Sequence, residues 1–267
     1  MPYAFGAAAG GGAFPQITLT QSQTWVAPQD GNVCIHLVGA GGGGSACTAQ
    51  QNKAWGAGAG GYCKKTSLAV TTGGSFTVVV GVGGQGIQYN NGTTGGNTTV
   101  AGPGLSATLT ANGGVRSLFN TAAGGLGGTA ANGDVNYTGG AGTYYGGGSV
   151  GVYSNGGSTA LYGQGSVSDA MGGGLAMSGY GQICGGHGAD EDSSYLTTET
   201  TSIASSYYYL KGGDLCGGGC RRFNVTGYMT AGTGGIGGGG GSVVQASSYG
   251  QGGRGGDGIV LIQYLPW

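Results

Sequence analysis

The sequence predicts an all-β protein: a small β-sandwich framework from strands near both ends of the chain, plus a bundle of glycine-rich helices of the polyglycine II type. Three observations support this class. Glycine makes up 71 of the 267 residues. Strand-like runs pass directly into or out of glycine runs at residues 33–45, 75–86 and 250–264. No segment shows the 3.6-residue apolar period of an α-helix, so little or no α-helix is expected.

The glycine runs predict an ordered bundle. They are irregular and accompanied by only 5 prolines, which excludes collagen. Apolar residues make up 38% and charged residues 6%, whereas disordered chains combine low hydrophobicity with high charge. A left-handed helix with three residues per turn has no internal hydrogen bonds. Neighbouring glycine segments can approach closely enough to satisfy each other's backbone groups, and we expect this to offset the entropy that glycine loses on folding.

The first strands of the framework are expected before residue 40. Residues 17–20 alternate in polarity, and residues 23–28 stay extended because Pro28 restricts Ala27. Residues 30–31 form an Asp-Gly turn signal. In the strand that follows, alternation places Cys34, His36 and Val38 on one face and Val33, Ile35 and Leu37 on the other.

Later strands complete the framework. Residues 62–70 and 76–80 read as a hairpin around a Gly-Gly turn, residues 98–100 and 105–110 as short strands, and residues 259–264 as an apolar closing strand. We therefore expect residues 1–16 to be an attachment or oligomer-contact segment and residues 17–267 to be a single glycine-rich domain. Within that domain, residues 17–112 and 250–267 form the β framework and residues 113–249 form the glycine-helix bundle with variable loops.

Composition excludes several classes of function. A net charge of −1 removes the electrostatic case for nucleic acid. No apolar run is long enough for a transmembrane helix, so no membrane insertion is expected, and the N-terminal residues lack the pattern of a signal peptide. No cofactor and no catalytic residue is expected. The carboxylates Asp190 and Asp192 could in principle cleave a glycan, but adjacent acids in an insert are expected to be solvated, so the protein is not predicted to be an enzyme.

The cysteines leave three alternatives open. Cys184, His187, Cys216 and Cys220 superficially fit a Cys₃His zinc set, but glycine on all sides makes such spacing common by chance, and no metal is predicted. Free buried thiols are the main expectation, because a reducing cytoplasm would keep thiols unpaired, with at least one disulfide as the other alternative.

A family resemblance rests on the strand-glycine motifs at residues 24–86 and 250–264. They resemble the glycine-rich domain of bacteriophage tail proteins and tail-fibre tips, including fibre-tip adhesins with polyglycine II helix bundles. The resemblance implies a β-sandwich, a glycine-helix bundle and a place in the virion after assembly in the host cytoplasm. It also implies contacts with other virion tail or fibre proteins, as a homotrimer or seated on a trimeric fibre.

The candidate recognition residues lie in inserts between glycine runs. The longest insert, residues 189–211, carries tyrosines of the kind that dominate recognition loops, beside a short acidic run. Its alternative role is to cover the glycine bundle or pack against another subunit. The candidates from this insert and from two shorter ones are Asp190, Glu191, Asp192, Tyr195, Tyr207, Tyr208, Tyr209, Lys53, Trp55, Arg221, Arg222 and Phe223.

The sequence therefore predicts a virion structural protein of a bacteriophage. The first hypothesis is a tail-fibre or tip receptor-binding protein that contacts a glycan or an outer-membrane protein of the host through displayed loops. The alternative is a purely structural appendage, such as a head fibre, decoration or minor tail protein, whose loops contact other virion proteins.

Overall fold

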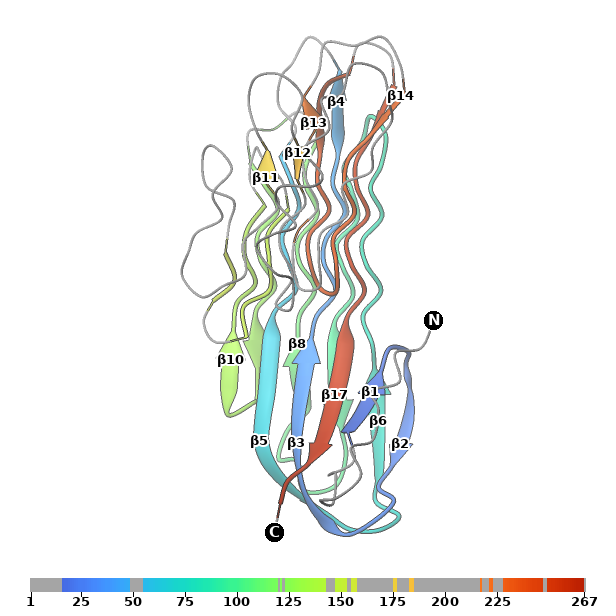
Figure 1. Cartoon of the computed structure of the whole chain (residues 1–267), viewed down its shortest axis with the longest axis vertical. Coiled ribbons are helices and arrows are strands. Elements are labelled where there is room, and N and C mark those ends of the chain that lie inside the picture. The colour runs from blue at the N-terminus through green and yellow to red at the C-terminus, as the bar shows by residue number, and fades with distance from the viewer. Residues whose placement is uncertain are drawn as a thin grey trace.

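Two five-stranded antiparallel sheets form the framework of the protein (Figure 1). A computed structural model describes residues 16–48, 55–119, 121, 123–142, 147–152, 155–157, 175–176, 183–184, 217, 221–222, 228–246 and 249–266. These residues contain strands and connecting segments and no helix. The predicted all-β class is confirmed.

The first sheet has the order β1-β17-β3-β5-β10. Its strands are β1 (Gln16–Leu19), β3 (Gly31–Val38), β5 (Tyr62–Val70), β10 (Val135–Tyr137) and β17 (Ile259–Tyr264). The second sheet has the order β2-β6-β7-β8-β9. Its strands are β2 (Gln23–Val26), β6 (Ser75–Val79), β7 (Thr98–Ala101), β8 (Leu109–Ala111) and β9 (Ala130–Ala131). The C-terminal strand thus lies inside a sheet of mainly N-terminal strands.

The core lies between the two sheets, and the alternation predicted for β3 is confirmed. Val33, Ile35 and Leu37 are fully buried in this core. From the second sheet, Trp25 and Phe76 contribute a tilted ring pair with centroids 5.1 Å apart. The other face of the strand packs elsewhere: Val38 belongs to a smaller cluster that covers the outer side of the first sheet near the glycine segments.

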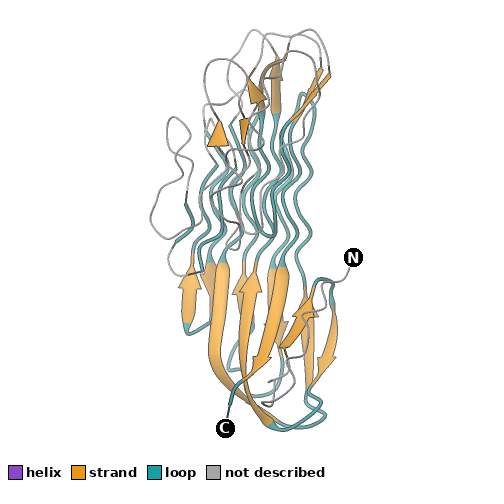
Figure 2. Ribbon diagram, in the orientation of Figure 1, coloured by secondary structure: helices purple, strands orange, loops and turns teal. Residues whose placement is uncertain are grey.

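Each interior strand of the two sheets continues into a glycine-rich segment in the same lateral order (Figure 2). Residues 81–86, 92–97, 112–118 and 123–129 extend β6, β7, β8 and β9, and we call them the outer layer. Residues 252–258, 39–44, 56–61 and 139–142 extend β17, β3, β5 and β10 and form the middle layer. Residues 147–150, 155–157, 231–236 and 237–241 form a third layer over the middle one. Strands and glycine segments therefore alternate along the chain on both sides of residue 113.

Hydrogen bonds of the central segment repeat every three residues. In residues 39–44, the N–H groups of the first and fourth residues donate to segment 58–61, those of the second and fifth to segment 93–96, and those of the third and sixth to segment 253–256, at 2.9–3.1 Å. Its carbonyls accept from segments 84–87, 114–117 and from Gly240. Backbone bonds thus link one segment to six neighbours.

This three-residue period equals that of the predicted polyglycine II helix. The left-handed helical geometry itself stays a prediction. The closeness of the segments explains why glycine is needed: a Cβ built on Gly41 or Gly44 would lie closer than 3.0 Å to carbonyl atoms of the neighbouring segment 237–241. In the sandwich, side chains hold the sheets about 10 Å apart, so backbone-to-backbone hydrogen bonds run within each sheet, although the Cys63 thiol reaches the carbonyl of Ala131 in the other sheet at 3.5 Å. Where side chains disappear, the layers bond to each other as well.

Candidate functional site

The end of the glycine layers opposite the sandwich carries a second set of short strands (Figure 1). We call this the distal end. There β13 (Arg221–Arg222), β15 (Val243–Ala246) and β4 (Ala46–Thr48) form a parallel sheet in that order. Next to it, β14 (Tyr228–Thr230) pairs in parallel with β16 (Tyr249–Gln251). A further pair, β11 (Leu175–Ala176) and β12 (Ile183–Cys184), is antiparallel.

Polar side chains fasten the glycine layers near this end. Ser117 donates its hydroxyl to that of Ser45 at 2.6 Å, and both residues are fully buried. The hydroxyl of Ser45 also lies 3.4 Å from the carbonyl of Leu118. Asn91 accepts the N–H of Phe119 through its side-chain oxygen at 2.7 Å. The serine bonds join the middle layer to the outer layer, and the Asn91 bond joins two neighbouring segments of the outer layer, so the distal end is tied to a regular scaffold.

Two of the three predicted inserts converge at the distal end. Arg221 and Arg222 form β13, which pairs with β15, and β15 pairs in turn with β4. The insert that contains Lys53 leaves from β4 and returns at Trp55, which is half-buried and begins the middle-layer segment 55–61. Chain topology therefore brings two candidates far apart in the sequence to one end of the molecule.

The third insert, residues 189–211, is bracketed by described residues. Before it lies β12, and after it comes Gly217, which is buried against the carbonyl of Gly147. The adjacent Gly148 donates its N–H to Ala57 at 2.9 Å, near the distal start of segment 55–61. Gly217, the first described residue after the insert, therefore lies in the distal half of the scaffold. The candidates Asp190, Glu191, Asp192, Tyr195, Tyr207, Tyr208, Tyr209, Lys53 and Phe223 lie outside the described residues.

A hydrogen-bonded network of Cys34, His36 and Tyr62 lies on the outer side of the first sheet. Because it pairs a thiol with an imidazole, it is the group of described side chains to test for nucleophilic catalysis. His36 Nδ1 lies 2.6 Å from the hydroxyl of Tyr62, and His36 Nε2 lies 3.3 Å from the sulfur of Cys34. Tyr62 in turn stacks on Tyr137. Burial lowers the pKa of His36, with a further contribution from the charge of Lys64. Burial also raises the pKa of the Cys34 thiol.

These pKa shifts favour a neutral thiol beside a neutral imidazole. A cysteine nucleophile needs the opposite arrangement, because the thiolate is the reactive form. The network therefore has the properties of a buried structural contact, and it does not support nucleophilic catalysis.

Metal ligation has no support among the described residues, where no three His, Cys, Asp or Glu side chains cluster. Cys34 and Cys63 are free thiols. Of the candidate zinc set, Cys184 lies in β12, while His187, Cys216 and Cys220 fall outside the described residues. The zinc alternative is therefore still open, as is the pairing of the remaining cysteines.

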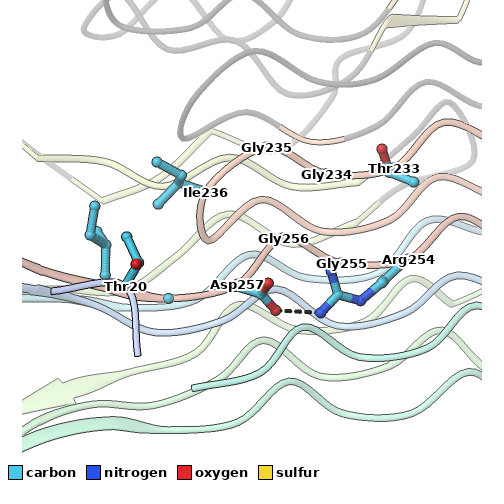
Figure 3. A pocket seen from close by; sticks show the side chains of 11 residues that line it. Thr20, Thr233, Gly234, Gly235, Ile236, Arg254, Gly255, Gly256 and Asp257 are labelled. Carbon is cyan, nitrogen blue, oxygen red and sulfur yellow. Dashed lines mark hydrogen bonds and ion pairs between the residues drawn. The ribbon is translucent and has the colours of Figure 1, made fainter. Parts of the chain in front are cut away.

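A groove of about 350 Å³ lies where the third layer meets the first sheet (Figure 3). It is lined by Thr20, by residues 233–236 and by residues 254–259. Its charges are already engaged, because Asp257 pairs with Arg254 and accepts the N–H of Gly83 at 2.7 Å. The groove offers glycine backbone and a neutralised ion pair, which is a poor basis for a specific small-molecule site.

Sequence reasoning missed the regular spacing of side chains on the surface segments. In the outer layer Val82 and Gln85, and likewise Val115 and Leu118, stand three residues apart and are exposed, while most of the residues between them are buried. The signal was present as runs of the form X-Gly-Gly, such as residues 123–128 and 254–258. With a three-residue turn, every third residue faces the same direction. Such runs mark surface segments, and unbroken Gly and Ala runs mark interior ones.

A family model described as a glycine-rich domain matches residues 17–265. No curated protein matches the sequence. Within the described residues, no helix has the length and hydrophobicity needed to cross a membrane.

Proposed function

This chain belongs to the glycine-rich domain family, and we propose that it is a bacteriophage virion protein of the tail fibre or its tip, which contacts the host cell surface through loops displayed at its distal end. The observation that carries this proposal is the separation of the two ends of the molecule. One end is a conventional sandwich, and the other gathers inserts from distant parts of the sequence.

The layers between the two ends suit a display scaffold. Segment 39–44 is held through backbone hydrogen bonds to six neighbours, which do not depend on side-chain identity. Inserts at the distal end can therefore change in sequence and length without altering the bonds that support them. This combination of a fixed scaffold and variable loops is typical of recognition proteins.

The described residues Gln16 and Leu265 both lie at the sandwich, which supports attachment there. Gln16, the first described residue, pairs with Gln263, which lies toward the end of β17 remote from the glycine layers. After β17, Leu265 donates its N–H to Asn32 at 2.8 Å, which holds the C-terminal residues against the start of β3. Contacts with other tail or fibre proteins would therefore form at the sandwich, and contacts with a host glycan or outer-membrane protein at the distal end.

Binding of the purified, fluorescently labelled chain to bacterial cells tests this function. Cells with truncated surface glycans or deleted outer-membrane proteins identify the receptor class. The critical variant replaces residues 189–211 by a short Gly-Ser linker. A control replaces two exposed sandwich residues, Ser67 by alanine and Ala69 by serine, both on the first sheet.

We expect the intact chain and the control to bind cells and the linker variant to lose at least tenfold in affinity. Absence of binding to any cell surface, combined with a particle map that encloses the distal end among virion proteins, would overturn the proposal in favour of a purely structural appendage.

A further inference from the structure

The exposed large apolar side chains of the described residues gather on one side of the molecule. Six of the seven lie on the solvent side of the second sheet or of the outer layer that extends it, and the seventh, Tyr89, lies in the turn that joins outer-layer segments 81–86 and 92–97. The most exposed are Leu126 at 68% and Val82 at 63%. We call this surface the neutral face; its apolar members are Val26, Val79, Val82, Val115, Leu118 and Leu126.

The strand register and the hydrogen bonds place these side chains in rows across the face. In the sheet, one row runs from Val79 through Thr99 and Thr110 to Ala131. In the outer layer, Asn112 donates from its side chain to the hydroxyl of Thr129 at 2.8 Å. Further along the same two segments, the N–H of Val115 donates to the carbonyl of Leu126 at 2.8 Å, so these two apolar residues are neighbours. The rows form a continuous surface from sandwich to outer layer.

The neutral face carries almost no charge. Among the residues of β2, β6, β7, β8, β9 and the four outer-layer segments, the one charged residue is Arg116. The opposite side of the sandwich is different: Lys64 lies beside His36 on the outer face of the first sheet, and the Lys65–Asp134 ion pair lies at the edge of that sheet next to β10. An extended apolar surface with few charges marks the centre of a protein interface, since buried charges oppose association.

We propose that the neutral face is a self-association surface on which a second copy of this chain packs face to face. Its size fits this occupant. The twelve residues from Ser75 to Gly86, at about 3.3 Å each, and four segments about 4.8 Å apart give a face of roughly 40 Å by 20 Å. Two copies would bury about 1,600 Å² in total, which is the usual size of a specific interface.

A second copy also suits the chemistry of the face. A surface without charge meets its own copy without like-charge repulsion, and its threonine and asparagine side chains can both donate and accept hydrogen bonds. Pairing of one patch with the same patch is isologous and closes as a twofold dimer. A homotrimer would instead need a second, different complementary patch, and the charged outer side of the first sheet is a poor match for the neutral face.

Sedimentation equilibrium of the purified full chain across a hundredfold range of concentration tests the inference. The test variant replaces Val82 and Leu126 by lysine, which adds charge beside Arg116. Both side chains are mainly exposed, so the monomer is expected to fold. The control replaces Ser67 and Ala69 by lysine and adds the same charge to exposed positions of the first sheet.

We expect the intact chain and the control to show a monomer–dimer equilibrium, with a dimer of twice the 25.6 kDa chain mass, and the test variant to weaken dimerisation at least tenfold. Leu126→Lys alone, with an unchanged thermal midpoint, separates lost association from lost folding. A monomer at all concentrations, a trimer, or a dimer that the test variant does not weaken would each overturn the inference. Cell binding by the distal end is measured separately, so either proposal can fail without the other.

Discussion

The N–H of Gly84 donates to the carbonyl of Gly41 at 2.8 Å and so ties the outer layer to the middle layer without any side chain. A Cβ on Gly84 would lie closer than 3.0 Å to backbone atoms of Thr93 and Gly43. The next residue, Gln85, points to solvent. Of these two adjacent residues, Gly84 therefore cannot accept a larger side chain without a clash, whereas Gln85 can be replaced freely.

Gly84→Ala is therefore expected to destabilise the protein strongly. The added methyl group forces two segments apart and weakens hydrogen bonds on both sides, so we expect a loss of about 3 kcal/mol in the free energy of unfolding. Gln85→Ala should change it by no more than about 0.5 kcal/mol. Denaturant unfolding measures both, and equal losses would contradict the close packing of the layers.

Asp134 should stabilise the fold in a pH-dependent way. Hydrogen bonds from Lys65 and Thr66 at 2.7–2.8 Å lower the pKa of Asp134 to about 2. Because the pKa is lower in the folded state, the stabilisation is present above the ordinary value of 3.8 and is lost as the pH falls toward 2. The site is partly exposed, so Asp134→Asn should cost less than about 1 kcal/mol at pH 7.

The measurement for this prediction is thermal unfolding of both proteins between pH 2 and 7. The stability difference between them should shrink below pH 4. A difference that stays constant across that range would show that the carboxylate charge has no role.

His36 should remain neutral below the pH at which an exposed histidine titrates. Burial, and then the charge of Lys64, lower the pKa of His36 below its ordinary value of 6.5. Since the unfolded chain binds the proton more readily, this group favours the folded state above 6.5 and reduces stability as the pH falls below that value.

Nuclear magnetic resonance titration of the imidazole protons measures this pKa directly. Lys64→Gln should raise the pKa of His36, because the repelling charge is removed. A titration at or above 6.5 in the intact protein would contradict the buried contact between His36 and Tyr62.

The thiols of Cys34 and Cys63 should be unreactive in the folded protein. Burial raises both pKa values, that of Cys63 to about 11. The thiolate is the form that alkylates, so a short pulse of iodoacetamide at pH 8 should leave both unlabelled until denaturant is added. Mass spectrometry of the labelled peptides gives the result, and rapid labelling of either cysteine in native conditions would contradict its placement.

The sandwich could be predicted from local pattern because its core follows the two-residue alternation of strands. The alternation correctly placed Val33, Ile35 and Leu37 on one face of their strand, and the structure shows that this face is the one in the core. The C-terminal strand was also recognisable, from the apolar run at residues 259–264. Its insertion between β1 and β3 was not, because strand order depends on pairing partners far apart in the sequence.

The sequence predicted that glycine segments bond to one another through their backbones, but not which segments are neighbours. The N–H and C=O groups of a glycine segment point outward and need hydrogen-bond partners on neighbouring segments. Gly41 illustrates this, because its N–H donates to the carbonyl of Gly256, which comes from near the other end of the sequence. Identical glycines carry no information about which segment is the partner. The order of the layers follows from the order of the strands that lead into them, and this could be read only after the sheets were known.

The candidate site could be placed only in outline. Arg221 and Trp55 are found where segments start or end at the distal end, which agrees with their position beside glycine runs. The residues of the insert 189–211 stay as predicted candidates. The exposed residues Val82 and Leu126 were missed because single apolar residues between glycines resemble linker composition and not a surface.

The continuity of strand and glycine segment has a mechanical consequence. A pull applied between the distal end and the sandwich acts along the backbone of β3, β5 and β17 and along the segments that extend them. Hydrogen bonds that cross between these side-by-side segments are then sheared together and are not opened one after another. Segment 39–44 shares its load with six neighbouring segments. We therefore expect the molecule to resist mechanical unfolding best when force is applied along the axis that separates its two ends.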